Sequence, residues 1–425
     1  MLFVVQIALS FGIAVATVRR PQWGIAVVVL CGAVLPFDVV RAAIGTSWHP
    51  ITTISVALLV VTLLRDPGQL GRTIGRHAVV MAVLFVFFGI AIVTSWYTGR
   101  FGDAGTIVLQ LVAPTALFLV VRARTADQPG LPGVVARTLV LVAVGEAILI
   151  LGIWSGVVTQ PWLSTLQGLR WWTPDAPRMP GTFDHPLVAA LWLSAAVPLS
   201  AALRAPWARA LVPVLLVVGV VLTGSRTALF AAVFAVAVLI IRSRVAALVK
   251  VAALVAAGIG LVVFLGSAAG AVISDRLEDD GGSSSARFRT IGLAVEQWSD
   301  TAIVGRGFGA SAQVTRNALI GNTFENPFLM FSVDFGLVAT VLFFAALVAL
   351  ILARSGPVPV PGSRLASALT VVVLIGFNSL STNTPIGLLL FLVLATVPGA
   401  DPERPDPPEA VHTRAGLRGT VEAAL

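Results

Sequence analysis

Charged side chains are scarce in this sequence, because Asp, Glu, Lys and Arg together make up only 11% of its 425 residues. Soluble domains carry roughly 25% charged residues. The hydrophobic share is 57%, and the mean hydropathy is +0.96. This composition excludes an ordinary soluble domain and predicts an integral membrane protein.

Cysteine and histidine are almost absent. Cys31 is the single cysteine and lies in an apolar run, so the chain offers neither an internal disulfide nor a thiolate metal site. The four histidines, His49, His77, His185 and His412, are too scattered to indicate a ligand cluster, and we expect no metal or other cofactor. The net charge of +8 comes almost wholly from Arg. A preference of Arg for cytoplasmic loops explains this charge, so we expect no nucleic-acid partner.

Long apolar segments follow one another along most of the chain. A transmembrane helix needs about 20 apolar residues, and fewer where Arg side chains lie at its ends. The pattern predicts an all-α bundle of about 12–13 spans, forming one transmembrane domain over residues 1–400. The expected spans are 2–18, 22–37, 50–64, 78–97, 104–121, 138–158, 187–203, 210–224, 227–241, 251–272, 326–352, 366–380 and 384–398.

Basic residues concentrate on alternate connections between these segments. One set of connections lies near residues 19–20, 65–76, 122–137, 204–209, 242–250 and 354–364. Since Arg and Lys prefer cytoplasmic loops, we expect this set on the cytoplasmic side. The opposite set contains loop 159–186 and a long loop at 273–325, which we expect on the extracytoplasmic face. Residues 401–425 are rich in Pro and charge, which predicts a disordered cytoplasmic tail.

The loop 273–325 is the longest polar stretch between two spans. It begins with the acidic and glycine-serine segment SDRLEDDGGSSSARFR and contains the glycine turn VGRGFGAS. Ile291, Ala294, Val295 and Trp298 recur at helical spacing, which predicts a short amphipathic helix on the membrane surface. A chain made mostly of spans has few places for chemistry, so this loop is the expected functional site.

Two polar clusters border the expected spans before this loop. The first is RMPGTFDHP, residues 178–186, in which Asp184 near an N-cap and Pro186 in the first turn are also typical of an ordinary helix start. The second is LTGSRTALF, residues 222–230, in which Arg226 stands at the expected outer boundary. Arg226 is either an anchor at the membrane surface or a functional residue, because most Arg here lies on the other side.

Two further clusters lie within the long loop. SSSARFR, residues 283–289, contains Arg287 and Arg289, which a flexible and solvated loop also explains. TFENPFL, residues 323–329, contains Glu325 and Asn326 before a proline, and Asn in this position also makes a good helix cap. Each cluster alone has an ordinary structural explanation. The four clusters together therefore indicate a functional site more strongly than any one of them.

In this order, the motifs RMPGTFDHP, LTGSRTAL, ARFRTIGLAVEQWSDTAIVGRGFG and ENPFLMFSVDFGL resemble the family of O-antigen ligases and O-antigen or exopolysaccharide polymerases. The resemblance covers Arg178 to about Leu337. It implies a metal-independent glycosyltransferase of the bacterial inner membrane, with its active site on the extracytoplasmic face. Such an enzyme moves a glycan from a polyprenyl diphosphate carrier to a hydroxyl of a glycan or glycolipid acceptor, with inversion at the anomeric carbon.

The resemblance also implies catalytic residues. Arg226 looks like the Arg of the family's Ser-Arg element, and Arg287 looks like the Arg that opens the loop helix. Arg pairs bidentately with phosphate oxygens, so we expect both to bind the diphosphate, with Arg289 in reserve. Glu325 replaces the family's usual His, and a carboxylate can take the proton of an acceptor hydroxyl as His would.

Other residues of the clusters are expected to bind the substrate. Asn326 and Leu329 retain the rest of the family's element around the replaced His. Arg178 and His185 belong to a loop on the same expected face. His185 is the substitute base if Glu325 is not the base.

Two carboxylates within expected spans favour an alternative function. Glu146 and Asp334 would be unfavourable facing lipid, and proton-coupled transport uses buried acids of this kind. The alternative is a secondary transporter or a flippase for lipid-linked glycans, although the chain shows no internal repeat. A purely structural membrane protein is the third possibility. The motifs do not separate a polymerase from a ligase.

Overall fold

The computed structural model describes residues 2–44, 48–100, 104–169, 172, 178–243, 246–248, 250–251, 255, 258, 266, 281–320, 324–353, 360–377, 380 and 384–397. The expected tail at 401–425 and most of the expected span at 251–272 lie outside these residues. So do residues 273–280, with which the expected external loop begins.

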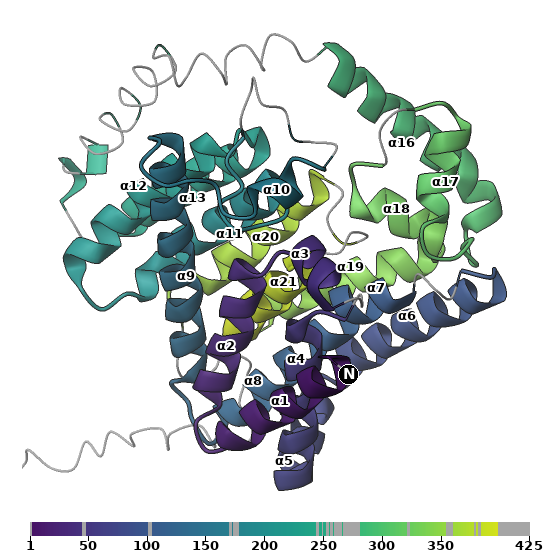
Figure 1. Ribbon diagram of the computed structural model, residues 1–425, viewed down its shortest axis with the longest axis horizontal. Coiled ribbons are helices and arrows are strands. Elements are labelled where there is room, and N and C mark those ends of the chain that lie inside the picture. The colour runs from purple at the N-terminus through teal and green to yellow at the C-terminus, as the bar shows by residue number, and fades with distance from the viewer. Residues whose placement is uncertain are drawn as a thin grey trace, which may run out of the picture.

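The described residues form helices and no strand, as the apolar segments predict (Figure 1). Proline occupies the first turn of many helices, where its missing N–H is not needed. The helices are α1 Leu2–Ala16, α2 Pro21–Val34, α3 Phe37–Ile44, α4 Pro50–Arg65, α5 Pro67–Arg76, α6 Ala78–Tyr97, α7 Ala104–Ile107, the π-helix η2 Val108–Val112, α8 Ala113–Thr125, α9 Leu131–Trp154, α10 Leu163–Leu166, α11 Pro186–Leu199, the 3₁₀ helix η3 Ser200–Ala202, α12 Pro206–Leu222, α13 Arg226–Arg242, α16 Gly281–Thr301, α17 Ala310–Asn317, α18 Pro327–Asp334, α19 Leu337–Leu352, α20 Ser363–Ile375 and α21 Ile386–Thr396.

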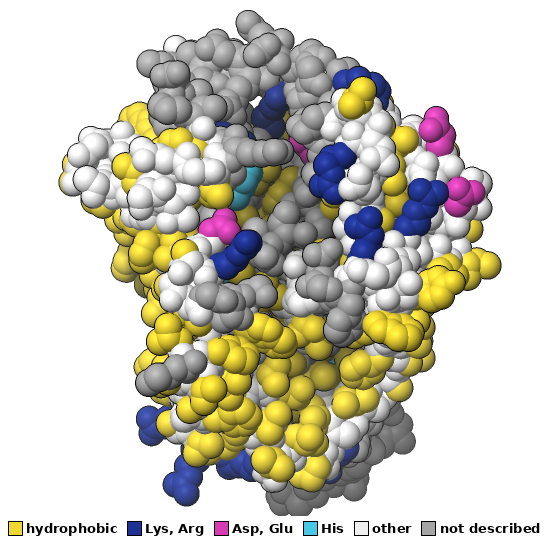
Figure 2. Space-filling model, turned by 45° about the vertical axis from the view of Figure 1, so that its right-hand side comes forward, with side chains coloured by type: hydrophobic (Ala, Val, Ile, Leu, Met, Phe, Trp, Pro, Cys, Tyr) yellow, Lys and Arg dark blue, Asp and Glu magenta, His cyan; other side chains and the backbone are white. Residues whose placement is uncertain are grey.

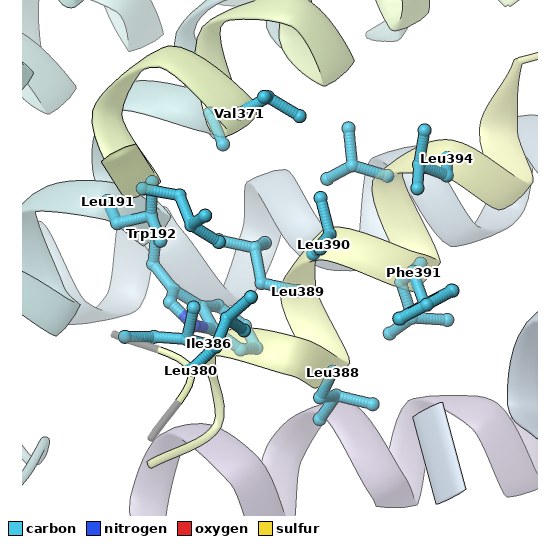
Figure 3. Packing of buried hydrophobic residues seen from close by; sticks show 14 of the residues in the cluster. Leu191, Trp192, Val371, Leu380, Ile386, Leu388, Leu389, Leu390, Phe391 and Leu394 are labelled. Carbon is cyan, nitrogen blue, oxygen red and sulfur yellow. The ribbon is translucent and has the colours of Figure 1, made fainter. Parts of the chain in front are cut away.

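Three helices of the bundle, α8, α11 and α21, are almost entirely buried. Helix α21 packs against α8, α9, α11 and α20, and α11 also packs against α12 and α13. Figure 3 shows Leu191 and Trp192 of α11 and Val371 of α20 beside the side chains of α21. A helix that is apolar on all sides belongs in the centre of a large bundle.

A polar contact joins α21 to the π-helix η2. The Gln110 amide donates to the carbonyl oxygen of Thr384 at 2.6 Å and accepts from the backbone N–H of Gly387 at 3.3 Å. A Cβ built on Gly387 would lie only 1.7 Å from the carbonyl oxygen of Gln110. Glycine at position 387 therefore permits a backbone-to-backbone approach in the middle of the core.

Three described helices are long and apolar enough to cross a membrane: Ala78–Tyr97, Gly105–Thr125 and Leu131–Trp154. Two bent pairs raise the number to five if each pair is one span. These are α2 with α3, bent by 94°, and α4 with α5, bent by 110°. The remaining apolar helices have 10–17 residues. The chain thus has the helices of a membrane protein.

Three connections with many basic residues, near 19–20, 65–76 and 122–137, meet at one end of the bundle, which we call the basic end. Arg65 donates to the carbonyl oxygen of Val18, and Gln128 donates to that of Arg19. Figure 2 shows dark blue side chains below a broad band of hydrophobic ones. These three basic connections, which alternate along the sequence, therefore lie at a common end in space.

The basic end contains an arginine that sequence analysis placed in a loop. Arg122 is only 8% exposed and lies in the last turn of α8. Its guanidinium lies over the ring of Phe118, 5.4 Å from the centroid, and donates to the carbonyl oxygen of Leu394 at 3.3 Å. Arg122 therefore fastens α8 to the C-terminal end of α21.

Candidate functional site

The described parts of the four sequence clusters lie at the opposite end of the bundle, which we call the motif end (Figure 1). It comprises residues 35–49, 98–100, 155–186, 223–226, 281–289 and 302–326, as far as they are described. Figure 2 shows the upper half of the molecule hollowed, with basic, acidic and histidine side chains around the hollow.

Arg178 joins the first cluster to the second. Its Nε donates to the carbonyl oxygen of Thr223 at 2.9 Å, and Nη2 lies 3.5 Å from that of Gly224. The backbone N–H of Met179 also donates to the carbonyl oxygen of Leu222. These acceptors end α12, where a cation is favourable next to the negative end of the helix dipole. Arg178, which we expected to bind substrate, thus holds the corner that precedes Arg226.

Thr182 reaches into the bundle and supplies the partner of Glu146. The Thr182 hydroxyl lies 2.5 Å from Glu146 Oε1 and 2.5 Å from the carbonyl oxygen of Ala33, and the Thr182 N–H donates to Glu146 Oε2 at 3.0 Å. A hydroxyl has one hydrogen and a carbonyl has none. The hydroxyl therefore donates to one of these two oxygens at a time, while the Thr182 N–H binds the other oxygen of the Glu146 carboxyl group.

Asp184 caps a helix other than the one it precedes. Its carboxylate accepts from the backbone N–H groups of Phe37 at 3.0 Å and Asp38 at 3.4 Å, in the first turn of α3. Burial raises the pKa of Asp184 to about 7, whereas the hydrogen bond from Phe37 acts in the opposite direction. The sequence predicted Asp184 near an N-cap and Pro186 in the first turn, and the structure places them there, but the Asp184 carboxylate caps α3 and not α11. The N-cap of α11 is His185.

His185 is poorly suited to act as a base. Its Nδ1 accepts the backbone N–H of Leu187 at 3.0 Å, which assigns the remaining proton to Nε2. Burial, together with the charge of Arg178, lowers the pKa of His185 to about 3. A proton could be added only at Nδ1, where it would displace the cap. His185 is therefore a neutral hydrogen-bond donor at this site.

We expect His185 to make the motif end less stable in acid. Because its pKa in the folded protein is lower than the ordinary 6.5, the unfolded chain takes up the proton first as pH falls below 6.5. The stabilisation lost from this residue approaches about 2 kcal/mol at pH 5. We expect His185→Asn, which retains a capping oxygen, to reduce the fall in melting temperature between pH 7.5 and pH 5. These pH values lie about one unit above and about 1.5 units below the usual His pKa.

Other groups act in the same measurement, so the comparison between variant and wild type is decisive. Burial also lowers the pKa of His49 to about 4, which adds to the loss in acid, whereas the raised pKa of Asp184 opposes it. Both contributions are common to the two proteins. An equal fall in melting temperature for wild type and His185→Asn would contradict the assignment.

Gly181 is needed for the buried contact of Glu146. Its φ is +63°, and a Cβ at this position would lie 2.3 Å from Glu146 Oε2, which Thr182 holds in place. We expect Gly181→Ala to lower the free energy of unfolding by about 2–3 kcal/mol, from backbone strain and the displaced acid together. Gly156→Ala is the matched control, because Gly156 has a φ of +74° but nothing within 4 Å of the added Cβ. Chemical denaturation of the two variants measures the difference, and equal losses would contradict the account.

Arg226 is the first residue of α13 and is half-buried. It follows Gly224, whose φ of +67° turns the chain between α12 and α13, and whose carbonyl oxygen faces Arg178. Its neighbour Thr227 packs against Gly376 at the end of α20. A first-turn Arg adds positive charge to the positive end of the helix dipole, so the position favours an anion nearby.

Glu325 and Asn326 lie directly before α18. Asn326 is the N-cap, since its Oδ1 accepts the backbone N–H groups of Phe328 at 2.8 Å and Leu329 at 3.4 Å. The capping role therefore accounts for the Asn. Glu325 is half-buried and follows Phe324, which is fully buried. Helix α18 contacts α20, and α13 contacts α20 as well, so Glu325 and Arg226 belong to helices around one common neighbour.

Helix α16 covers α18 with a face different from the expected one. Ala294 is fully buried, and Trp298 donates its indole N–H to the hydroxyl of Ser332 at 2.8 Å. Ile291 and Val295, expected on the same face, do not pack on α18 and are exposed. Arg289 is exposed, and Arg287 belongs to α16, but its side chain lies outside the described residues.

Asp334 is not part of one long span, and the predicted span 326–352 was wrong in this respect. The helix breaks after Asp334, and Gly336 has a φ of +101°. The Asp334 carboxylate accepts the backbone N–H groups of Ser311 at 2.7 Å and Gly309 at 3.1 Å, at the start of α17. Its own backbone carbonyl accepts from Gly307. Asp334 thus connects the glycine turn to α18 and does not face lipid.

Sequence reasoning missed the anchoring roles of Thr182, Asp184 and Asp334. Their partners are 36, 147 and 23 residues away in the chain, and local periodicity cannot reveal such pairs. The glycines beside them were the available signal. Gly181 and the glycines of the turn at 305–309 mark places where another group approaches the backbone.

Among the described residues, no group of three or more His, Cys, Asp or Glu side chains could hold a metal ion. Neither a family model nor a curated protein matches the chain.

Proposed function

We propose that the protein is a glycosyltransferase of the bacterial inner membrane, with an extracytoplasmic active site and about 12–13 spans. It would move a glycan from a polyprenyl diphosphate carrier to a hydroxyl of a glycan or glycolipid acceptor. It acts as a polysaccharide polymerase or a ligase of the O-antigen type. The resemblance of the four sequence clusters to that family is the basis of the proposal.

One observation carries the proposal furthest. The hydrogen bonds from Arg178 to Thr223 and Gly224 join two sequence clusters that lie 45 residues apart, directly before Arg226. The cluster with Glu325 begins a helix that shares the neighbour α20 with the helix of Arg226. The described residues of these clusters thus belong to one end of the bundle, which supports a common site.

The proposed chemistry needs one base and a cationic pocket. The acceptor hydroxyl oxygen attacks the anomeric carbon from the face opposite the diphosphate, and the bond between that carbon and the diphosphate oxygen breaks. The hydroxyl proton passes to Glu325, and polyprenyl diphosphate leaves with the bonding electron pair. Arg226 and Arg287 would stabilise the charge that grows on the leaving group. Diphosphate is a good leaving group once cations stabilise its negative charge, so no separate general acid is required. Many glycoside hydrolases, by contrast, use a general acid to protonate the leaving group.

A transfer assay tests this function. Purified protein in liposomes is incubated with a polyprenyl diphosphate oligosaccharide and a glycan acceptor. We expect a lengthened or ligated glycan together with an equal amount of released polyprenyl diphosphate. Movement of the lipid-linked glycan across the bilayer without release of lipid diphosphate would overturn the proposal in favour of a flippase.

The transporter alternative has less support from the structure than from the sequence. It depends on buried acids within spans, and Asp334 instead binds the start of α17. Glu146 remains, as a buried acid of α9 with Thr182 as its partner. If Glu146 carried protons for transport, Glu146→Gln would abolish uptake of a substrate driven by a pH gradient.

A further inference from the structure

Helix α16 has three distinct faces along its described C-terminal part. One face packs on α18 and includes Thr290, Ala294 and Thr301, all nearly or fully buried. A second face carries charge and lies in water, with Arg289, Glu296 and Asp300 exposed. The third face lies between these two and is apolar.

The apolar face is a stripe of large exposed side chains. Phe288 is 75% exposed, Ile291 is 45% exposed and Val295 is 49% exposed. They recur at intervals of three and four residues, so they follow one side of the helix. We call these three residues the α16 stripe. Ile303 and Val304, just past the helix end, extend the exposed apolar surface, at 75% and 60% exposure.

The α16 stripe is continuous with the outer side of the apolar helix α19. The backbone N–H of Val338, in the first turn of α19, donates to the carbonyl oxygen of Ala302 at 3.0 Å. Val338, Val341 and Leu342 are large exposed apolar residues of α19. Ile303 therefore lies at the junction of the two exposed surfaces.

The end of helix α6 indicates how deep the surface formed by the α16 stripe and Ile303 lies in the membrane. Helix α6 is one of the three helices long and apolar enough to cross a membrane, and it ends with Trp96 and Tyr97, which are 68% and 83% exposed. Trp and Tyr concentrate at the level of the lipid headgroups. The hydroxyl of Ser95 accepts the backbone N–H of Phe308 at 3.1 Å, so the turn after α16 lies at the same level.

We propose that the α16 stripe is seated in the boundary between headgroups and acyl chains of the outer leaflet. A helix lying in this boundary has an apolar face in the acyl region and a charged face in water, which matches the two exposed faces of α16. The charged side of the boundary is also where a lipid-linked diphosphate lies. The stripe then sets the height of Arg287 and Arg289 relative to that diphosphate, and this second part rests on the proposed function.

Nitroxide labels measure whether the α16 stripe lies in lipid or in water, without any assay of activity. On a Cys31→Ala background, single cysteines replace Phe288, Ile291 and Val295, with Arg289, Glu296 and Asp300 replaced as matched controls on the charged face. The labelled proteins are placed in phosphatidylethanolamine and phosphatidylglycerol liposomes. We expect the stripe positions to collide mainly with oxygen, which concentrates in the bilayer, and the controls mainly with a water-soluble nickel chelate.

Two results overturn the seating. If all six positions collide mainly with the nickel chelate, α16 lies in water. If the stripe positions are shielded from both reagents, the stripe is covered by protein and not by lipid.

Kinetics test separately whether the α16 stripe sets the height of Arg287 and Arg289 relative to the diphosphate. We expect Ile291→Ser together with Val295→Ser to raise KM for the lipid-linked donor about tenfold and to leave kcat unchanged, since the proposed catalytic groups remain. An unchanged KM with labels in the bilayer would overturn the height role alone. Absence of transfer by the wild type would instead count against the proposed function and leave the seating intact.

Discussion

Replacing Arg226 with Ala, or Glu325 with Gln, is expected to lower kcat for glycan transfer by at least about a hundredfold. Arg226→Ala removes a cation from the start of α13, where the diphosphate charge would grow during bond cleavage. Glu325→Gln keeps the size of the side chain but removes its ability to take a proton. Initial rates of lipid diphosphate release at saturating donor measure both effects.

Matched variants separate chemistry from damage to the fold. Arg242→Ala changes an exposed Arg at the other end of α13, and Glu296→Gln changes an exposed Glu of α16 outside the proposed pocket. Both should retain the wild-type rate. Arg226→Lys should recover only part of the activity, because a lysine does not reproduce the bidentate fork of Arg. Full activity of Glu325→Gln would remove Glu325 as the base, and His185 is a poor replacement while its Nδ1 caps α11.

Replacing Gly387 with Ala is expected to be the most destabilising single change considered, with a loss of about 4 kcal/mol or more. The added Cβ would meet the carbonyl oxygen of Gln110 at 1.7 Å, and backbone atoms cannot turn aside as a side chain can. Separation of α21 from η2 would also weaken the two hydrogen bonds of the Gln110 amide. Buried groups left without partners add to the loss.

Gly145→Ala is the matched control for this prediction. Gly145 lies in the interior of α9, and nothing lies within 4 Å of a Cβ added there, whereas Gly387 lies in the first turn of α21. Alanine favours a helix over glycine by roughly 1 kcal/mol, so Gly145→Ala should be neutral or stabilising. Melting temperatures in detergent compare the two variants. Similar melting temperatures would show that α21 does not approach η2 as described.

The bundle follows from local properties of the sequence, which is why much of it could be predicted. The expected span 78–97 is the helix α6 over the same residues. Long apolar stretches form helices because the backbone must satisfy its own hydrogen bonds in lipid. The alternation of basic connections similarly predicted loops that meet at a common end.

Breaks and bends were less accessible to sequence reasoning. Hydropathy continues through 326–352, so it predicted one span, whereas Asp334 binds the start of α17 and the chain turns at Gly336. Helix α5 was likewise assigned to a loop, although it follows α4 at an angle of 110°. In each case a contact distant in sequence outweighs the local pattern.

In the candidate site too, local features could be predicted from the sequence, whereas contacts between distant residues could not. Sequence reasoning identified the clusters 178–186 and 222–226, but not that Arg178 holds one against the other. It identified α16 as amphipathic and assigned Ala294 and Trp298 to the membrane, because periodicity shows that a face is apolar without showing what covers it. Residues with helix-capping partners, such as Asn326, were the ones whose structural role was foreseeable.

Photocrosslinking of the lipid substrate tests the central claim most directly. A polyprenyl diphosphate with a photoreactive group next to the diphosphate is bound to the wild-type protein in liposomes, irradiated and mapped by mass spectrometry. The account predicts adducts at the motif end, on peptides that contain Arg226, the start of α16 or Glu325, and competition by unlabelled polyprenyl diphosphate. Adducts confined to the basic end, on peptides that contain Arg65 or Arg122, would contradict it.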